Sequence, residues 1–174
     1  MLGFDYMRRH NEVVRCIHLM LCNKFGIKRS KKMKTNSVQE IVENANAEIR
    51  VDTRVQIDAK FKNDWPDIYV FDKKKNEVIF IEVGITNQDL LTVVENEKLR
   101  KYDLLANEVA MIKKCKVKII PYVITWDAVV TIYHKKYINE LGITPKIEAY
   151  IQSIVLKKAL ESISPGRRRG EIGG

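Results

Sequence analysis

The chain has 174 residues, which fits one domain, and 45% of them are hydrophobic, which is enough for a single core. No apolar run approaches the length of a membrane span, and no charged-then-apolar leader is present, so we expect neither a membrane protein nor a secreted one. The formal charge is +9, an excess that suits a polyanionic partner such as nucleic acid, although a solvated basic surface is the alternative. The three cysteines form no disulfide framework, so we expect a reduced, intracellular protein.

The first predicted element is a helix over residues 6–24, where apolar side chains recur near the helix period. A basic segment follows at residues 28–34, and we interpret it as an exposed loop that can serve in nuclear import or in backbone contacts. Ser37 precedes Glu40 by three positions, which is the pattern of a capping box. This pattern predicts a short helix over residues 37–46.

Three predicted strands come next. Residues 49–57 alternate between apolar and polar side chains, which predicts a half-buried strand. Residues 67–71 form a second predicted strand, and a charged turn at residues 72–76 would join it to a third in an antiparallel hairpin. The third strand, residues 78–83, is nearly all apolar, which is typical of a central strand that is covered on both faces.

The second half of the chain is predicted to alternate between helix and strand. After a break at residues 84–87, a long helix is predicted over residues 88–114 and a fourth apolar strand over residues 117–123. Further helices are predicted over residues 130–141 and 145–162. A strand meander followed by a strand–helix–strand crossover predicts an α/β fold of the α+β type, with a mixed sheet and helices packed on its faces.

Glu82 is the unusual residue of the third predicted strand. It shares a strand face with Val78 and Phe80, and a carboxylate is costly to bury there unless something positive pairs with it. The hairpin would bring the start of the second strand beside the end of the third, and therefore Asp67 close to Glu82. Two carboxylates forced together either share a proton or bind a cation, and such oxygen ligands suit Mg²⁺ or Mn²⁺.

The predicted long helix contributes Lys98 and Tyr102, which lie one turn apart on its inward apolar stripe. A lysine that reaches the two carboxylates can position or deprotonate an attacking water and stabilise charge on a phosphate. The alternative is a lysine at the edge of the stripe, with a packed stem and a solvated head.

Several of these residues resemble a known family of nucleases. Pro66-Asp67, followed after fourteen residues by Glu82-Val83-Gly84, resembles the PD-(D/E)xK core with glycine in place of its final lysine. One branch of that family carries the lysine on the following helix, namely the restriction-like endonuclease domain of site-specific non-LTR (LINE-type) retrotransposons. The chain is similar to that branch between Tyr6 and Leu141, through Tyr6, Arg9-His10-Asn11 and Val14, through residues 67–70 and 81–85, and through residues 97–104 and 118–123.

The resemblance implies a metal-dependent endodeoxyribonuclease that nicks target DNA for retrotransposon insertion by target-primed reverse transcription. By analogy, Asp67, Glu82 and the backbone carbonyl of Val83 hold Mg²⁺ or Mn²⁺. Lys98 takes the role of the migrated lysine, and Tyr102 assists it. The second acid is glutamate here, where that branch often has aspartate.

Two groups of basic residues leave alternatives open. Lys101 competes with Lys98 for the role of the catalytic lysine, and we prefer Lys98 because it lies on the inward stripe. The first strand carries Arg50, Asp52 and Arg54 on one face, which can point at a phosphate but is more simply a polar outer face with internal ion pairs. Contacts to nucleic acid are expected from Arg9, His10, Arg54 and Lys101.

The expected organisation is one nuclease domain over residues 1–163. It comprises an N-terminal helix and basic loop (1–36), a catalytic core (37–125) and C-terminal helices (126–163), with a flexible basic tail at residues 164–174. In the family a zinc knuckle usually precedes this domain, and because none is seen here, we expect a C-terminal piece of a larger retrotransposon polyprotein that includes reverse transcriptase. The expected partner is DNA, including branched or structured DNA, and the expected location is nuclear.

Two other functions remain open at this point. Gly84 in place of lysine favours a catalytically inactive nuclease-fold module that binds nucleic acid, and a third reading is a resolvase-like nuclease that acts on branched DNA. A further metal ligand, Glu40 or Glu43, is also open, although the capping box explains Glu40 without chemistry.

Overall fold

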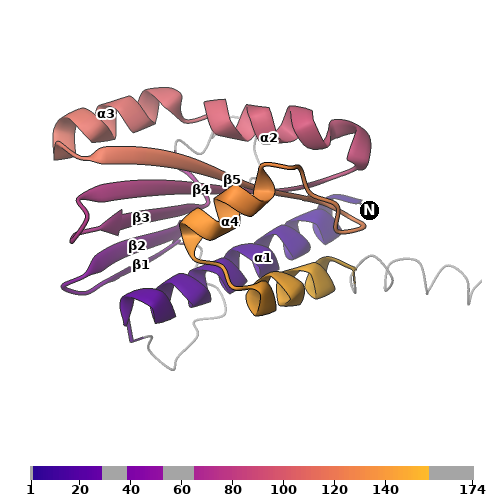
Figure 1. Cartoon of the computed structure of the whole chain (residues 1–174), viewed down its shortest axis with the longest axis horizontal. Coiled ribbons are helices and arrows are strands. Elements are labelled where there is room, and N and C mark those ends of the chain that lie inside the picture. Colours follow the sequence, from indigo (N-terminus) through magenta and orange to yellow (C-terminus); the bar gives the residue numbers. More distant parts are fainter. Residues whose placement is uncertain (1, 29–38, 53–64, 157–174) are drawn as a thin grey trace, which may run out of the picture.

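The structure is a computed structural model of the chain, and it describes residues 2–28, 39–52 and 65–156 (Figure 1). The described elements, in chain order, are α1 (Leu2–Phe25), β1 (Gln39–Glu43), β2 (Ala47–Asp52), β3 (Ile68–Asp72), β4 (Glu77–Thr86), a 3-10 turn (Gln88–Leu90), α2 (Leu91–Arg100), α3 (Asp103–Lys113), β5 (Lys116–Thr125) and α4 (His134–Leu141). Residues 145–156 are also helical.

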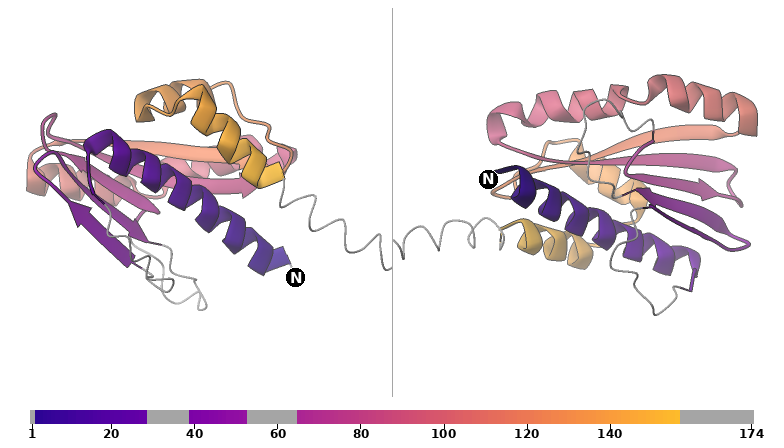
Figure 2. Two further views of the ribbon diagram at one scale, coloured as in Figure 1. Left: turned by 90° about the horizontal axis from the view of Figure 1, so that it is seen from below. Right: turned by 180° about the vertical axis from the view of Figure 1, so that it is seen from behind.

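The strands form one mixed sheet in the order β1-β2-β3-β4-β5. The first four strands make an antiparallel meander, and β5 pairs with β4 in parallel after the crossover through α2 and α3. Helices α2 and α3 lie over one face of β4 and β5, whereas α1, α4 and residues 145–156 lie on the other face (Figures 1 and 2). The predicted mixed sheet with helices on both of its faces is therefore confirmed.

Strand β4 is central and contributes alternate side chains to two separate apolar clusters. Ile81 and Val83 belong to the larger cluster, which they share with α1 and the C-terminal helices. Val78 and Phe80 belong to the smaller cluster, with Tyr102 from the α2–α3 side. Since side chains alternate along a strand, Glu82 is directed to the face that α2 covers, as the sequence predicted.

The helix predicted over residues 37–46 is wrong, because residues 39–43 form the edge strand β1. The Asn44 side-chain oxygen accepts hydrogen bonds from the backbone N–H groups of Asn46 at 2.8 Å and Ala47 at 2.9 Å. This turn reverses the chain into β2. Residues 39–43 then form backbone hydrogen bonds with β2 in an antiparallel pair, and this pairing favours a strand over a helix. Ser37, the expected cap, lies outside the described residues.

The single helix predicted over residues 88–114 is also wrong, because Lys101 and Tyr102 separate α2 from α3. The Tyr102 ring packs edge-on against Phe80, with 6.3 Å between ring centroids, and its hydroxyl donates to the Trp65 carbonyl at 2.9 Å. These tertiary contacts hold Tyr102 at a backbone φ of −114°, outside the helical range.

The break predicted at residues 84–87 is wrong for most of its length, because β4 continues to Thr86 beside β5. The first predicted strand is confirmed from residue 49 to residue 52, and its remainder lies outside the described residues. The fourth predicted strand is confirmed as β5. None of the helices in the described ranges is long and apolar enough to cross a membrane.

The last two predicted helices are confirmed in part. Helix α4 begins at His134 rather than at residue 130. Residues 145–156 are helical as expected, whereas the end of that predicted helix and the predicted basic tail lie outside the described residues.

Candidate functional site

Asp67 and Glu82 meet where β3 begins and β4 runs past it. The hairpin pairs Ile68 with Ile81, which brings Asp67 beside Glu82. The Asp67 backbone N–H donates to Glu82 Oε2 at 3.1 Å, and the Val83 backbone N–H donates to Asp67 Oδ2 at 2.8 Å. Each carboxylate is thus fixed by the backbone of the other's strand.

The backbone of Asp67 is also tied to β2, because the Asp52 N–H donates to the Asp67 carbonyl at 3.1 Å. Asp67 therefore lies between two strands that both hold it, and its side chain starts from a fixed point. Such anchoring is what a preorganised binding group requires.

Two lysines reach the buried carboxylate of Glu82, which is 3% exposed. Lys98 Nζ lies 3.4 Å and Lys101 Nζ 3.3 Å from the same oxygen, Glu82 Oε1. The Lys98 side chain is 20% exposed and the Lys101 side chain 46%. The structure thus brings both candidate lysines to the acid, and Lys98 is the more deeply enclosed of the two.

Gly84 makes room for Lys98. A Cβ atom built on Gly84 would lie 3.2 Å from Lys98 Cε, 3.2 Å from Val94 Cγ1 and 3.4 Å from Val123 Cγ2. The stem of Lys98 therefore lies directly over the position where a side chain at residue 84 would begin. Glycine at residue 84 and the path of the Lys98 side chain therefore depend on each other, because a Cβ atom at residue 84 would require the Lys98 stem to shift slightly.

Helix α1 also reaches the site, through His10. His10 Nε2 lies 3.0 Å from Asp67 Oδ2, and its other ring nitrogen lies 3.2 Å from the Asn11 side-chain oxygen. The Tyr6 ring stacks on the imidazole, with 6.0 Å between centroids and an interplanar angle of 25°. Sequence spacing gave no sign of this contact, because His10 and Asp67 are 57 residues apart.

Proton affinities in the site are shifted by burial and by the two acids. Burial, followed by the charge of Asp67, raises the pKa of Glu82 despite the opposing charges of Lys98 and Lys101. Burial lowers the pKa of His10, but the hydrogen bond and charge of Asp67 outweigh it, so that the net shift is upward. Burial also works against the charge on Lys98, yet Glu82 and the neighbouring acids raise its pKa overall.

Tyr102 supports the backbone that leads into the site. Its hydroxyl donates to the carbonyl of Trp65, two residues before Asp67. Burial, and then the charges of Glu82 and Asp67, raise the pKa of the Tyr102 phenol well above its ordinary value. Tyr102 is thus a neutral hydrogen-bond donor that holds the entry to β3.

The other predicted positions are less central. Arg9 is 5% exposed, and its guanidinium lies 4.6 Å from the ring centroid of Trp126, so it contributes to packing. Arg54 lies outside the described residues. The contacts to nucleic acid expected from Arg9, His10, Arg54 and Lys101 stay predictions.

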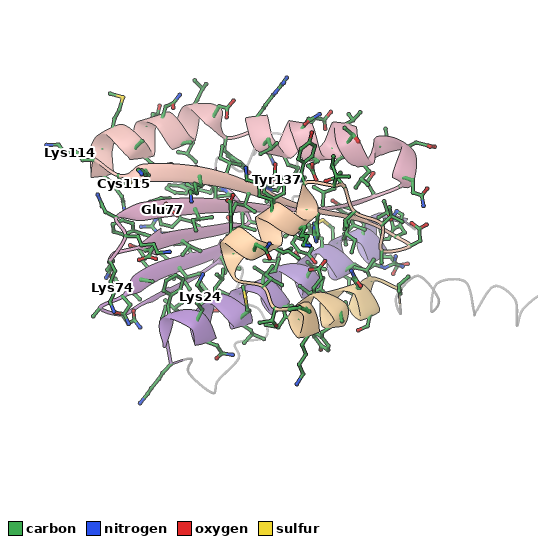
Figure 3. The ribbon with its side chains drawn as sticks, in the orientation of Figure 1. Lys24, Lys74, Glu77, Lys114, Cys115 and Tyr137 are labelled. Atoms are coloured by element: carbon green, nitrogen blue, oxygen red, sulfur yellow. The ribbon has the colours of Figure 1, made fainter. Side chains whose placement is uncertain are left out.

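Neither glutamate of β1 lies at the carboxylate pair. Glu43 pairs with Lys73 of the β3–β4 turn, at the end of the sheet where Figure 3 labels Lys74 and Glu77. Glu40 pairs in register with Val51, whose side chain belongs to the α1 face, so Glu40 is directed away from the face of Glu82.

Arg50, which the sequence places on the polar face of the first predicted strand, also lies in this region. Its guanidinium lies 5.5 Å from the Trp65 ring centroid and 5.4 Å from that of Tyr69. Its Nε donates to Glu48 at 2.6 Å. Arg50 pairs in register with Tyr69, so its guanidinium lies beside the start of β3. The guanidinium is held by these contacts and is partly exposed.

A second buried polar cluster, also missed at the sequence level, joins β5 to the C-terminal helices. His134 Nε2 lies 2.7 Å from Glu148 Oε1, and the Tyr122 hydroxyl donates to Glu148 Oε2 at 2.9 Å. The cluster lies among residues of the larger core, on the face of the sheet opposite Glu82, and it ties three elements together.

The donor set at Asp67 and Glu82 fits a small, hard divalent cation. Among the described residues, no group of three or more histidine, cysteine, aspartate or glutamate side chains gathers to hold a metal. Two carboxylates are nevertheless the usual protein contribution to a Mg²⁺ site that is completed by water and substrate phosphate. Both described hydrogen bonds to the Asp67 carboxylate end on Oδ2, and within the described residues Oδ1 accepts none.

No protein-family model matches this sequence, and a search of curated proteins finds no match either.

Proposed function

We propose that this chain is a metal-dependent nuclease of the PD-(D/E)xK type that hydrolyses phosphodiester bonds in DNA. The observation that carries the proposal is the arrangement of Asp67, Glu82 and Lys98. Each carboxylate accepts a hydrogen bond from the backbone of the other's strand, and Lys98, whose stem lies over Gly84, contacts Glu82. Burial and the neighbouring charge of Asp67 raise the pKa of Glu82, and carboxylates brought together in this way are typical of sites that bind a cation.

The topology supports the same assignment. Strands β2, β3 and β4 form a meander that presents the two acids, and the α2–α3 crossover leads to a parallel strand, β5. We assign this unit to the PD-(D/E)xK core, with β1 as an added edge strand. The glycine at residue 84 then stands where the motif has its lysine, and Lys98 supplies the ammonium group from the next helix.

Each residue has a chemical task under this proposal. Asp67 and Glu82 would hold Mg²⁺ or Mn²⁺, with the Val83 carbonyl as a third oxygen. Such an ion, when bound, supplies an activated water and stabilises charge on the phosphate. Lys98 positions the attacking water and donates to a phosphate oxygen. Tyr102 keeps the residues before Asp67 in place.

The surface around the site suits a polyanion. Lys101 is half-exposed next to Glu82, and Arg50 is braced by Glu48, Trp65 and Tyr69. The net charge of +9 adds a long-range attraction that weakens with salt. We further propose that the biological substrate is the target DNA of a non-LTR retrotransposon and that the chain acts within a larger polyprotein with reverse transcriptase.

The direct test is metal-dependent nicking of supercoiled plasmid by the wild type, Asp67→Asn and Glu82→Gln. We expect the wild type to nick with Mg²⁺ or Mn²⁺ and both variants to lose nicking while they still bind DNA. Glu43→Gln is the matched control, because this carboxylate lies at the other end of the sheet, and we expect it to nick normally. Undiminished nicking by both site variants would refute the proposal.

The same assay separates the alternatives. A wild type that shifts DNA in gels but cuts no substrate with either metal would favour an inactive binding module. Preferential cutting of flaps, Y-shaped DNA or four-way junctions over plain duplex would favour a resolvase-like nuclease.

A further inference from the structure

We propose that His10 is a positioning residue for Asp67 and that the first turns of α1 are therefore part of the site. This inference rests on the proposed function. Under this proposal, α1 sets the orientation of the Asp67 carboxylate, whereas the two acids bind the cation and Lys98 contacts water and phosphate.

The geometry at Asp67 Oδ2 supports this assignment. That oxygen accepts two hydrogen bonds, from His10 Nε2 at 3.0 Å and from the Val83 backbone N–H at 2.8 Å. Two donors on one oxygen fix the rotation of the carboxylate about its terminal bond. They leave Oδ1 without a hydrogen bond in the described part of the chain, and we infer that Oδ1 is the oxygen that binds the cation.

His10 is itself held on two sides. Tyr6, one helical turn earlier, stacks on the imidazole, and the Asn11 side-chain oxygen lies 3.2 Å from Nδ1. Because the His10 side chain is only 10% exposed, it offers little surface to DNA, whereas its Nε2 is directed at Asp67. Loss of a hydrogen-bonded partner that orients a ligating carboxylate typically lowers metal affinity or activity by about 10- to 100-fold.

The neighbours of His10 strengthen the attachment of α1 to this end of the sheet. Arg9 lies over Trp126, which directly follows β5, and the Tyr6 ring meets Trp126 edge-on with 6.1 Å between centroids. Tyr6, Arg9 and His10 therefore dock one face of α1 against the site. A rigid mount is required if a single hydrogen bond is to set the angle of a carboxylate.

The test compares His10→Ala with His10→Gln. The glutamine amide nitrogen can take a place close to that of Nε2 and keep the donor, whereas alanine removes it. We expect His10→Ala to weaken Mn²⁺ binding in calorimetry by about 10- to 100-fold and to lower kcat for nicking with little change in KM for DNA. His10→Gln should recover most of both losses.

His18→Ala is the control, since His18 is a buried histidine on the same helix, near Cys22 and away from the carboxylates. We expect it to lower the melting temperature without changing the affinity for Mn²⁺. Mn²⁺ affinity that falls equally in His18→Ala and His10→Ala, or that is not recovered in His10→Gln, would overturn the role of His10.

The two proposals fail in different ways. If Asp67→Asn abolishes Mn²⁺ binding and His10→Ala leaves it intact, the metal site stands and the positioning role is refuted. If the wild type binds no Mn²⁺ at all, both proposals fall.

Discussion

Glu82 is held by groups from three directions. The Asp67 N–H binds one oxygen, and the two lysines share the other. Both ammonium groups lie within hydrogen-bond reach of Glu82, whereas the described hydrogen bonds to the Asp67 carboxylate come from His10 and the Val83 N–H. If Asp67 and Glu82 hold a cation, the lysine beside them would be the group that contacts water and phosphate.

The two lysines are expected to differ in their effect on catalysis. Lys98 is the more enclosed, and its stem is fixed over Gly84, so Lys98→Ala should slow single-turnover nicking by about 100-fold or more. Lys101→Ala should mainly weaken DNA binding, because half of its side chain is in solvent. Nicking rates at saturating Mn²⁺ and DNA distinguish the two, and a larger loss in Lys101→Ala would reverse the assignment.

The pairing of Gly84 with Lys98 predicts that the lysine can be moved. In the double variant Gly84→Lys, Lys98→Ala, the new side chain starts 3.2 Å from the position of Lys98 Cε, on the face of β4 that carries Glu82. We expect it to nick on the order of tenfold faster than Lys98→Ala alone. The control is Gly84→Leu with Lys98→Ala, which fills the same space without charge and should recover nothing. Equal rates for these two double variants would argue against an interchangeable lysine.

At the scale of elements, regular periodicity made the central parts predictable. Two apolar runs on either side of a charged turn predicted the β3–β4 hairpin, and the hairpin alone brings Asp67 to Glu82. Strand β1 was missed because a serine–glutamate spacing has the same form in a helix cap, whereas the edge strand depends on its pairing with β2. The break at Tyr102 was missed because it results from contacts with Phe80 and Trp65, which no local pattern encodes.

The site was predictable to the same extent. The acids and Lys98 stood out because charged side chains interrupt apolar patterns. The contact of His10 with Asp67, the packing of Arg50 on Trp65 and the Glu148 cluster were not predicted, because each depends on packing between segments that are separated in the sequence.

The buried cluster around Glu148 is expected to join residues 145–156 to β5. Burial raises the pKa of Glu148, but the hydrogen bond and charge of His134 and the hydrogen bond of Tyr122 outweigh it and depress the pKa below its ordinary value. Its ionised form therefore stabilises the fold above the unfolded-state pKa, and this contribution is lost as the pH falls through the lower, folded-state pKa.

Glu148→Gln should accordingly reduce the free energy of unfolding by about 1–3 kcal/mol at neutral pH. The difference from wild type should shrink as the pH falls toward about 3, below the ordinary pKa of glutamate. Thermal melts across this range test it, with the more exposed Glu140→Gln as the control, expected to change stability by less than about 0.5 kcal/mol. A pH-independent difference would show that the ionisation of Glu148 is not what stabilises the fold.

For the whole molecule, the charge of +9 predicts DNA binding that weakens steeply with salt. Arg50 is the braced cation nearest the start of β3, and we expect Arg50→Ala to lower the slope of log affinity against log salt by about 1. Lys136→Ala, a mostly exposed change on α4, should leave the slope nearly unchanged. Binding titrations at several salt concentrations measure both slopes, and equal slopes in the two variants would remove Arg50 from the DNA contact.

The roles proposed for Asp67, Glu82, Lys98 and His10 depend on one ion bound between β3 and β4. Crystals of the protein soaked in Mn²⁺ and measured at the manganese absorption edge would locate it directly. We predict an anomalous peak within coordination distance of both Asp67 Oδ1 and a Glu82 carboxylate oxygen, at about 2.0–2.2 Å. Manganese bound only elsewhere, or no peak at the carboxylate pair at saturating concentration, would contradict the nuclease assignment.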